Sequence, residues 1–302
     1  MAKSVLSRYL DPEVLSHIAD RQLQPRSLVV GNLAGAHKSP LSGFAVEFAG
    51  HREYVPGDDP KHVDWRVFYS RDKYFVKQYE LETNFICHLL LDVSASMRYG
   101  DSRQQKMLYA AQMATALGYS ICRQSDKVSL ATFDSRVRGV ITPSNSMNQI
   151  VKMTAHLEEI DPVEKTSMAD CLSELIGRMG RREIVIIFSD FFTDLDSLEP
   201  LLQRLRYSKH EVVLMQVMHH DELAFELDGM VKFVGLEVPD ELLAQTEDLR
   251  RGYLAAVKKF NTQFEDMCQR NGCERILVDT SRNMAEVFVD YLNKRSLLNR
   301  GR

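Results

Sequence analysis

The 302-residue sequence predicts an α/β fold in which helices cover both faces of a doubly wound, mainly parallel sheet. From residue 85 onward, short apolar runs alternate with longer segments whose apolar residues recur every three or four positions. Runs that are apolar on both faces are typical of strands buried between two helical layers. Strands that alternate with helices indicate the doubly wound arrangement. Residues 1–84 lack this alternation, and we expect them to form a small strand-containing appendage to a domain spanning 85–302.

Composition and charge are those of an ordinary globular chain. Hydrophobic residues make up 44% and charged residues 26%, which excludes a mostly disordered chain. The formal charge of -4 argues against a broad basic surface for nucleic acid. The five cysteines form no CxxC pair and are expected to be reduced thiols. No apolar run approaches the roughly 20 residues of a membrane span. We therefore expect a cytoplasmic protein with no membrane span and no nucleic-acid partner.

The first 84 residues are predicted to contain one short helix and two strands. Asp11–Asp20 has Pro12 in its first turn, where proline favours the start of a helix. A stretch rich in Gly, Ser and Pro follows it at 31–43. Alternating apolar residues then indicate strands at Phe44–Phe48 and Tyr74–Tyr79.

Between these strands lies a polar region that could suggest a second metal site. His51, His62 and Asp64 lie there with two further aspartates, but no spacing matches a helical ligand pair. We expect a hydrogen-bonded turn instead, with the Pro56-Gly57 pair setting the bend. Trp65, the only tryptophan, is expected to anchor a core.

The second part of the chain supplies the sheet and its helices. Strands are predicted at Phe85–Leu91, Val128–Phe133, Glu183–Ser189, Glu211–Val217 and Arg275–Val278. The first of these is expected to be a central strand. An apolar stripe from Met107 to Ile121 predicts the first helix. Further helices are predicted at Met147–Glu158, Met168–Met179, Leu195–Tyr207, Leu242–Gln269 and Asn283–Lys294. Arg295 and the final arginines are expected to form a solvated tail.

Hydroxyl and carboxylate side chains follow two of the predicted strands. Asp92 ends the first, with Ser94 and Ser96 two residues apart, and Asp190 ends another, while Thr166 opens a later helix. In an open α/β sheet the ligand lies outside the carboxyl ends of the strands, where the strand order switches. Oxygen donors of this kind are the ligands that Mg²⁺ prefers. The serines and the threonine could merely cap helices, but an aspartate closing each of two strands favours the metal interpretation.

The pattern resembles the metal-ion-dependent adhesion site of von Willebrand factor A domains, which has DxSxS after a strand, a later threonine and a strand ending in Ser-Asp. The chain is also similar to the bacterial "domain of unknown function 58" family. This resemblance is carried by the segment HREYVPGDDPKHVDWRVFYSRDKYFVKQYELETN before LLLDVSASM. That family is von Willebrand factor A-like and is often encoded beside MoxR-type AAA+ ATPases. The resemblance covers nearly the whole chain, including GLEVPDELL and LRRGYLAAVKKF.

The resemblance implies a von Willebrand factor A-like fold and a site for Mg²⁺ or another divalent cation, occupied at rest or not. The five implied ligand positions are Asp92, Ser94, Ser96, Thr166 and Asp190. The hydroxyls would bind directly or nearly so, the aspartates often through water, and a carboxylate of a protein partner would complete the coordination. Phe191 and Phe192 stand where many such domains have glycine. With Met97, they are expected to form an apolar partner-binding rim.

These observations favour a non-enzymatic protein-interaction module, an adaptor or cofactor of a MoxR-type ATPase acting on a protein client. A hydroxyl-rich ligand set leaves residual charge and an open position on the cation, which suits binding more than catalysis. The sequence has no GxxxxGK[ST] motif, so the ATPase would be a separate chain. No small-molecule substrate is expected.

The alternative is a Mg²⁺-dependent phosphoryl-transfer hydrolase with Asp92 as nucleophile. A serine hydrolase lacks both a GxSxG elbow and an assignable histidine base. We expect Asp92 in a surface cleft.

Overall fold

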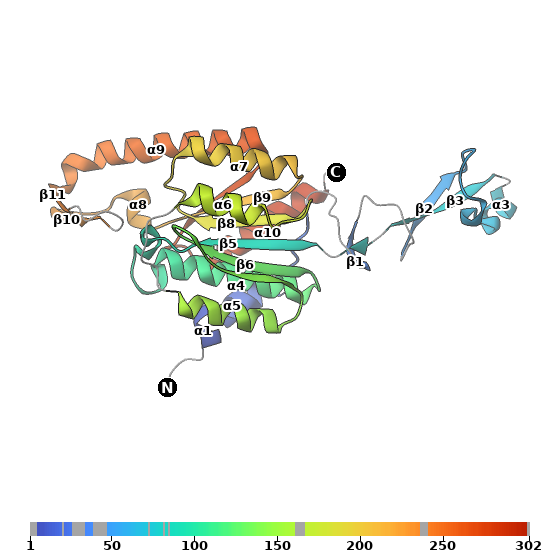
Figure 1. Ribbon diagram of the computed structural model, residues 1–302, viewed down its shortest axis with the longest axis horizontal. Coiled ribbons are helices and arrows are strands. Elements are labelled where there is room, and N and C mark those ends of the chain that lie inside the picture. Colours follow the sequence, from blue (N-terminus) through green and yellow to red (C-terminus); the bar gives the residue numbers. More distant parts are fainter. Residues whose placement is uncertain are drawn as a thin grey trace. The chain divides into compact units, whose positions relative to one another are not determined.

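A six-stranded sheet forms the centre of the larger of two units in the computed structural model (Figure 1). The structure describes residues 5–19, 21–25, 34–38, 47–71, 73–80, 82–83, 85–160, 167–235 and 241–300. The strands of the sheet are β5 (Ile86–Asp92), β6 (Lys127–Phe133), β7 (Val137–Ser144), β8 (Ile184–Ser189), β9 (Glu211–Met218) and β12 (Glu274–Asp279). They lie in the order β12-β9-β8-β5-β6-β7, and only β6 and β7 are antiparallel. The predicted α/β class, the mainly parallel sheet and the central first strand are confirmed.

The order of the strands reverses at the middle of the sheet. Counted along the chain from β5, the first three strands build outward on one side and the last three on the other. β5 and β8 are therefore neighbours in the sheet. The chain leaves β5 toward the β7 edge and leaves β8 toward the β12 edge. Such a switch point is where open α/β sheets bind ligands, at the carboxyl ends of the strands.

Helices cover both faces of the sheet. They are α4 (Lys106–Arg123), α5 (Asn148–Glu159), α6 (Met168–Ile176), α7 (Leu195–Tyr207), α8 (His220–Ala224), α9 (Thr246–Asn271) and α10 (Met284–Arg300). α6, α7 and α9 cover one face, and α4 and α5 lie on the other (Figure 1). Leu172, Leu202 and Phe264 pack from the first group onto apolar side chains of β5, β8 and β9. None of the helices in the described ranges has both the length and the apolar composition needed to cross a bilayer.

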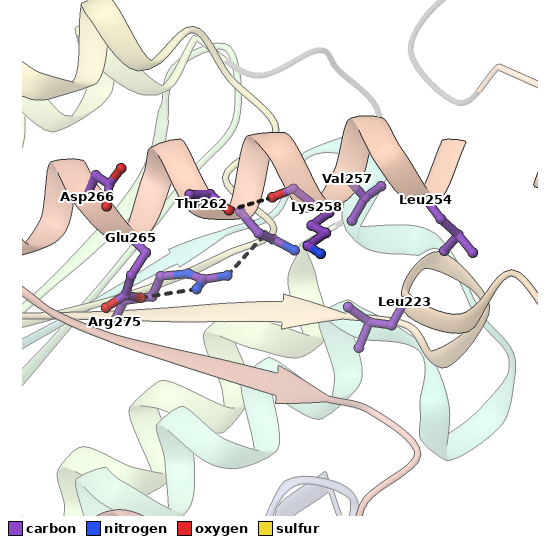
Figure 2. Close-up of a pocket in the computed structure, with 9 residues that line it drawn as sticks. Leu223, Leu254, Val257, Lys258, Thr262, Glu265, Asp266 and Arg275 are labelled. Atoms are coloured by element: carbon purple, nitrogen blue, oxygen red, sulfur yellow. Dashed lines mark hydrogen bonds and ion pairs between the residues drawn. The ribbon is translucent and has the colours of Figure 1, made fainter. Parts of the chain in front are cut away.

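The long helix α9 overhangs the β12 edge of the sheet. A groove of about 540 Å³ lies beneath it, lined by Leu223, Leu254 and Val257 at one end and by Glu265 and Arg275 at the other (Figure 2). We call this hollow the α9 groove.

The N-terminal residues belong with the larger unit, which comprises 1–26 and 86–302. The predicted division at residue 85 had assigned them to the appendage. They form α1 (Val5–Tyr9) and α2 (Pro12–Ile18), and Tyr9, Ile18 and Leu23 are buried. α1 contacts α4 and α5, and α2 contacts α4 and α10. The apolar side chains of this segment thus complete one helical layer of the larger unit.

Three strands of the larger unit were not predicted. β7 is an edge strand with a mixed polar pattern. β10 (Met230–Val234) and β11 (Glu241–Gln245) pair as an antiparallel hairpin. The predicted helix from Leu242 therefore begins later, at Thr246, because residues 241–245 take their hydrogen bonds from β10.

The smaller unit, residues 27–85, has its own strands. β2 (Glu47–Glu53) pairs with β3 (Phe75–Glu80), and β1 (Ala34–Lys38) pairs with β4 (Glu82–Thr83). β3 matches the strand predicted from Tyr74, whereas 44–46 of the other predicted strand, like most of the stretch 31–43, lie outside the described residues.

The polar region of this unit is a hydrogen-bonded turn, as expected. His51 Nε2 lies 2.9 Å from Asp64 Oδ2, and Arg52 donates to Asp58 at 2.8 Å. Trp65, which opens α3 (Trp65–Arg71), is 54% exposed and packs edge-on against Phe68. The expectation that it anchors a core was wrong, because its aromatic neighbours lie beside it on the surface rather than around it.

Candidate metal centre

Asp92 lies at the switch point, where β5 ends beside β8. Its Oδ1 accepts a hydrogen bond from the Ser94 amide at 2.9 Å, and its Oδ2 accepts one from Ser189 Oγ at 2.6 Å. The side chain is only 1% exposed. Asp92 was expected in a surface cleft, but the loop that follows β5 turns back over it. Ser189, the last residue of β8, holds this carboxylate. It is the serine of the Ser-Asp pair that ends the strand, and no role was predicted for it.

Burial raises the pKa of Asp92 to about 7, and the neighbouring Asp190 carboxylate adds to this shift. The hydrogen bonds from Ser189 and Ser94 act in the opposite direction. The site therefore disfavours the charge of Asp92 in the absence of a compensating cation. A divalent ion nearby would favour the ionised form and release the proton.

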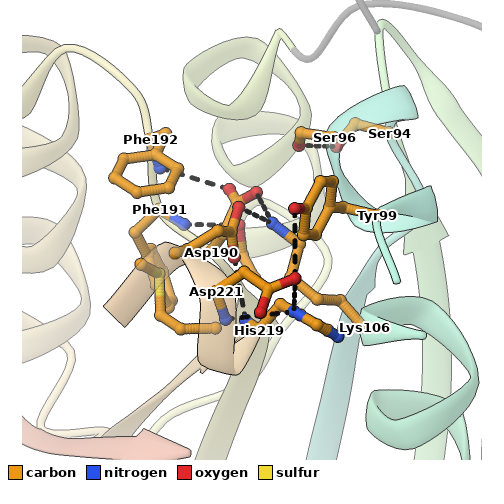
Figure 3. Close-up of polar contacts among 12 residues, drawn as sticks. Ser94, Ser96, Tyr99, Lys106, Asp190, Phe191, Phe192, His219 and Asp221 are labelled. Carbon is orange, nitrogen blue, oxygen red and sulfur yellow. Dashed lines mark hydrogen bonds and ion pairs between the residues drawn. The ribbon is translucent and has the colours of Figure 1, made fainter. Parts of the chain in front are cut away.

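The two serines of the motif lie together. Ser94 Oγ and Ser96 Oγ are 3.1 Å apart (Figure 3). Ser94 precedes the short 3-10 helix Ala95–Arg98, but its side chain makes no capping hydrogen bond. The alternative that it merely caps a helix is therefore not supported. Ser94 is fully buried and Ser96 is half-buried.

Thr166 lies outside the described residues, and its place in the site stays a prediction. The adjoining Ser167 donates its amide to the Asp134 carbonyl at 3.0 Å. Asp134 directly follows β6, so Ser167 lies at the same carboxyl edge of the sheet as Asp92.

A buried lysine, not predicted from the sequence, completes the site. Lys106 Nζ lies 2.9 Å from Asp190 Oδ2 and 2.8 Å from Glu222 Oε1, and the side chain is fully buried (Figure 3). Burial alone would lower the pKa of Lys106, but the Asp190 and Glu222 carboxylates raise it overall. The ammonium is thus charged and holds Asp190. The only sequence signal was a lysine at the head of an otherwise apolar helical stripe.

The helix that supplies Glu222 is capped by its own residues. His219 Nδ1 accepts from the Asp221 amide at 3.2 Å, and Glu222 Oε2 accepts from the His219 amide at 2.8 Å. His219 is 7% exposed and its ring packs edge-on against Tyr99 (Figure 3). This capped segment fixes one side of the Lys106 ion pair.

The predicted apolar rim is only partly available to a partner. Phe192 is 46% exposed, and its ring lies 5.5 Å from that of Phe260. Phe191 and Met97 are fully buried, so their assignment to partner binding was wrong. Phe191 has φ 57°, which turns its ring inward onto Phe264, 5.0 Å away. Glycine adopts this left-handed backbone conformation most readily. That preference accounts for the glycine that the sequence resemblance implies at this position.

The donors present fit a hard divalent cation. Within the described ranges, no group of three or more His, Cys, Asp or Glu side chains is arranged to hold a metal. A site here must therefore use hydroxyls, as Ser94 and Ser96 provide beside Asp92. With Asp92 ionised, the three carboxylates of Asp92, Asp190 and Glu222 exceed the single ammonium of Lys106. This excess of negative charge at a largely buried set of oxygen donors suits Mg²⁺.

The family model described as "Protein of unknown function DUF58" matches residues 50–263. The chain belongs to this family, as the sequence resemblance implied. The match begins in the smaller unit and extends well into the larger one.

Individual relatives and solved structures are distant. Uncharacterized proteins of Mycobacterium bovis and of two Mycobacterium tuberculosis strains are each 22% identical over 211 residues. The match covers 69% of this chain and 66% of each relative, just under two thirds of its length. BatB from Bacteroides thetaiotaomicron is 13% identical with a TM-score of 0.47, covering 70% of this chain and 99% of that one. The von Willebrand factor A domain of SpRpn10 is 11% identical with a TM-score of 0.39, covering 68% and 94%.

Proposed function

We propose that this chain is a non-enzymatic protein-interaction module that binds a divalent cation, with Mg²⁺ the expected ion. The ligands would be Asp92, Ser94, Ser96, Thr166 and Asp190. The observation that supports this most is the gathering of carboxylate and hydroxyl oxygens at the switch point between β5 and β8, with an excess of buried negative charge. Neutral hydroxyls in the ligand set favour binding of a further carboxylate over catalysis.

The surrounding residues would prepare this site for a partner. The Ser94 amide and Ser189 Oγ orient Asp92, and Lys106 holds Asp190 through one oxygen. When bound, the cation would supply an open position for an Asp or Glu of the partner. Phe192, exposed beside Asp190, offers the partner an apolar contact.

The partner we propose is a MoxR-type AAA+ ATPase together with a protein client. This rests on the resemblance to a family often encoded beside such ATPases. The absence of a P-loop motif from the sequence is consistent with ATP hydrolysis by a separate chain.

Phosphoryl transfer from a phosphate ester to Asp92 as nucleophile, with loss of the alcohol and later hydrolysis of the aspartyl phosphate, is the second candidate, and Lys106 is the observation in its favour. A lysine near the reacting carboxylate could clamp a phosphate. However, Lys106 is fully buried and already pairs with two carboxylates, and both oxygens of Asp92 accept hydrogen bonds. An aryl phosphate assay with and without Mg²⁺ separates the two functions. Turnover that is lost in Asp92→Asn would support the enzyme.

The binding proposal is tested by titrating the protein against the purified ATPase in Mg²⁺ and in EDTA. We expect wild type to bind more tightly in Mg²⁺, and Asp92→Asn to bind equally weakly in both. Asp196→Asn, an exposed acid in the first turn of α7, is the matched control and should behave as wild type. Because Asp92 is buried, the fold of each variant is checked by circular dichroism. Equal affinity of wild type in both conditions would contradict the metal-bridged mechanism.

A further inference from the structure

The two edges of the central sheet differ in how well they are protected. β7, at one edge, contains Pro143, and its register with β6 shifts at two points. Proline and bulges are common means of blunting an edge strand. β12, at the other edge, has no proline and pairs with β9 through six consecutive residues without a shift. In the part of the chain that the structure describes, β12 pairs with β9 alone.

The backbone groups at this open edge can be identified. The Thr280 amide donates to the Met218 carbonyl of β9 at 3.0 Å. Because alternate residues of a strand direct their hydrogen-bonding groups to opposite sides, the even-numbered residues of β12 face β9. The amides of Arg275, Leu277 and Asp279 and the carbonyls of Arg275 and Leu277 therefore face the open edge. The Asp279 carbonyl instead accepts from the Arg282 amide at 3.1 Å. The Leu277 side chain is 42% exposed.

We propose that β12 is a homodimer interface, at which β12 of a second copy adds in antiparallel orientation about a two-fold axis at Leu277. An open strand edge is complementary to another extended strand. In this arrangement the Leu277 amides and carbonyls bond to each other across the axis. The Asp279 amide of each copy donates to the Arg275 carbonyl of the other.

The side chains of β12 are self-complementary in this register. Arg275 lies opposite Asp279 of the second copy, and Leu277 lies opposite its own counterpart. On the other face of the sheet, Ile276 lies opposite Val278 of the second copy. Opposite charges and apolar pairs both stabilise antiparallel neighbours. Moving the axis by one residue would place Arg275 opposite Leu277 and lose the charge pairing.

Both charged residues are already held in position. Arg275 contacts Glu265 at 3.1 Å and Asn261 at 2.9 Å (Figure 2). Asp279 Oδ2 accepts a hydrogen bond from His220 Nδ1 at 2.9 Å. The side chains of Arg275, Asp279 and Leu277 share the face of β12 that lies under α9. The apolar end of the α9 groove, with Leu223, Leu254 and Val257, therefore adjoins the proposed interface.

Light scattering after size exclusion tests the dimer on the full chain. We expect twice the chain mass of 34.6 kDa at concentrations up to about 100 μM, a range that detects micromolar association. Leu277→Pro removes the outward amide without removing a hydrogen bond to β9, and should give the chain mass alone. Leu277→Ile keeps the amide and should remain dimeric. A monomeric wild type, or a dimer that persists in a folded Leu277→Pro variant, would overturn the proposal.

Two charge reversals test the register. Arg275→Glu and Asp279→Lys each place like charges opposite one another in a dimer with itself, and each should be monomeric. In a mixture of the two variants, the introduced glutamate meets the introduced lysine, and the remaining Asp279 meets the remaining Arg275. The mixture should therefore recover the dimer mass. If two folded variants fail to associate with each other while each alone stays monomeric, an axis at Leu277 is contradicted.

Discussion

Asp92 is held in place by two hydrogen bonds while its surroundings disfavour its charge. Its pKa rises from an ordinary value of 3.8 to about 7, first because of burial and then because of Asp190. The folded protein therefore binds this proton more tightly than the unfolded chain does. Between about pH 4 and pH 7, the stability contributed by this group must fall as the pH rises.

We predict this pH dependence from a comparison of wild type with Asp92→Asn in EDTA. Wild type should lose on the order of a few kcal/mol relative to the variant between pH 4 and pH 7. Urea unfolding across this range measures the difference. Mg²⁺ at pH 7 should restore wild type and leave the variant unchanged. Parallel stability curves for the two proteins would show that Asp92 is not desolvated in this way.

Removing the Lys106 ammonium should be strongly destabilising. Lys106→Met would leave the buried Asp190 and the partly buried Glu222 without a counter-charge, at a cost of about 3–5 kcal/mol. Adding Glu222→Gln should recover part of this loss, because only one carboxylate then remains. Lys152→Met, at an exposed position on α5, is the control and should cost little. An equal midpoint of chemical unfolding for Lys106→Met and wild type would contradict the ion-pair assignment.

The two buried cations show what the sequence could not reveal about single residues. Lys106 and Arg295 both stand in helices that follow apolar patterns, and Arg295 was expected in a solvated tail. Arg295 is 1% exposed and pairs with Glu211, which begins β9. Glu222 and Glu211 lie far along the chain from the cations they neutralise. Only the tertiary fold brings such partners together, whereas Asp92 and Asp190 could be predicted because each ends an apolar strand.

The turn between β8 and α7 combines backbone strain with side-chain burial at Phe191. A positive φ at a non-glycine residue costs on the order of 1 kcal/mol or more. Removing a buried phenylalanine side chain costs about 3–5 kcal/mol. Phe191→Gly should therefore destabilise the protein by about 2–3 kcal/mol, since the lost packing exceeds the relieved strain. Guanidinium unfolding measures this, and a variant more stable than wild type would contradict it.

Helices and strands were predicted well where the apolar pattern of their own residues is clear. They were predicted poorly where the secondary structure depends on pairing with another strand. The five parallel strands and α4 to α7 follow from apolar runs and helical stripes. β11 was missed because Leu242 and Leu243 also fit the helical pattern that continues into α9. Its pairing with β10 is set by residues separated by a loop, which no local pattern records. β7 was missed because an edge strand with one face in solvent lacks a continuous apolar run.

At the scale of the whole chain, residues 27–85 form one unit, and residues 1–26 pack with the larger unit rather than with them. No pattern in the sequence indicates this packing, because a short amphipathic helix does not show which surface it covers. The meeting of Asp92, Ser94 and Ser189 at one edge of the sheet could be predicted, since β5 and β8 flank the switch in strand order. That these groups bind a metal ion stays a prediction.

We predict that the larger unit folds without residues 27–85. Replacing that segment by a short Gly-Ser linker should leave one cooperative thermal transition within a few degrees of the corresponding wild-type transition. Deleting residues 1–26 from the full chain is the contrasting variant. It removes Tyr9, Ile18 and Leu23 from the larger unit and should lower the midpoint clearly. Loss of the folded state in the first variant, with the second unaffected, would contradict this division.

The most direct test of the metal site is a titration with Mn²⁺, a spectroscopic substitute for Mg²⁺, followed by electron paramagnetic resonance of the free ion. We expect one saturable ion per chain in the wild type. Ser94→Ala combined with Ser96→Ala should weaken binding by about tenfold or more, because it removes both serine hydroxyls while keeping the Asp92 carboxylate and its hydrogen bonds to the Ser94 amide and Ser189. Asp196→Asn should bind as wild type does. No saturable binding by the wild type, or equal binding by the double serine variant, would contradict a hydroxyl-rich cation site at the end of β5.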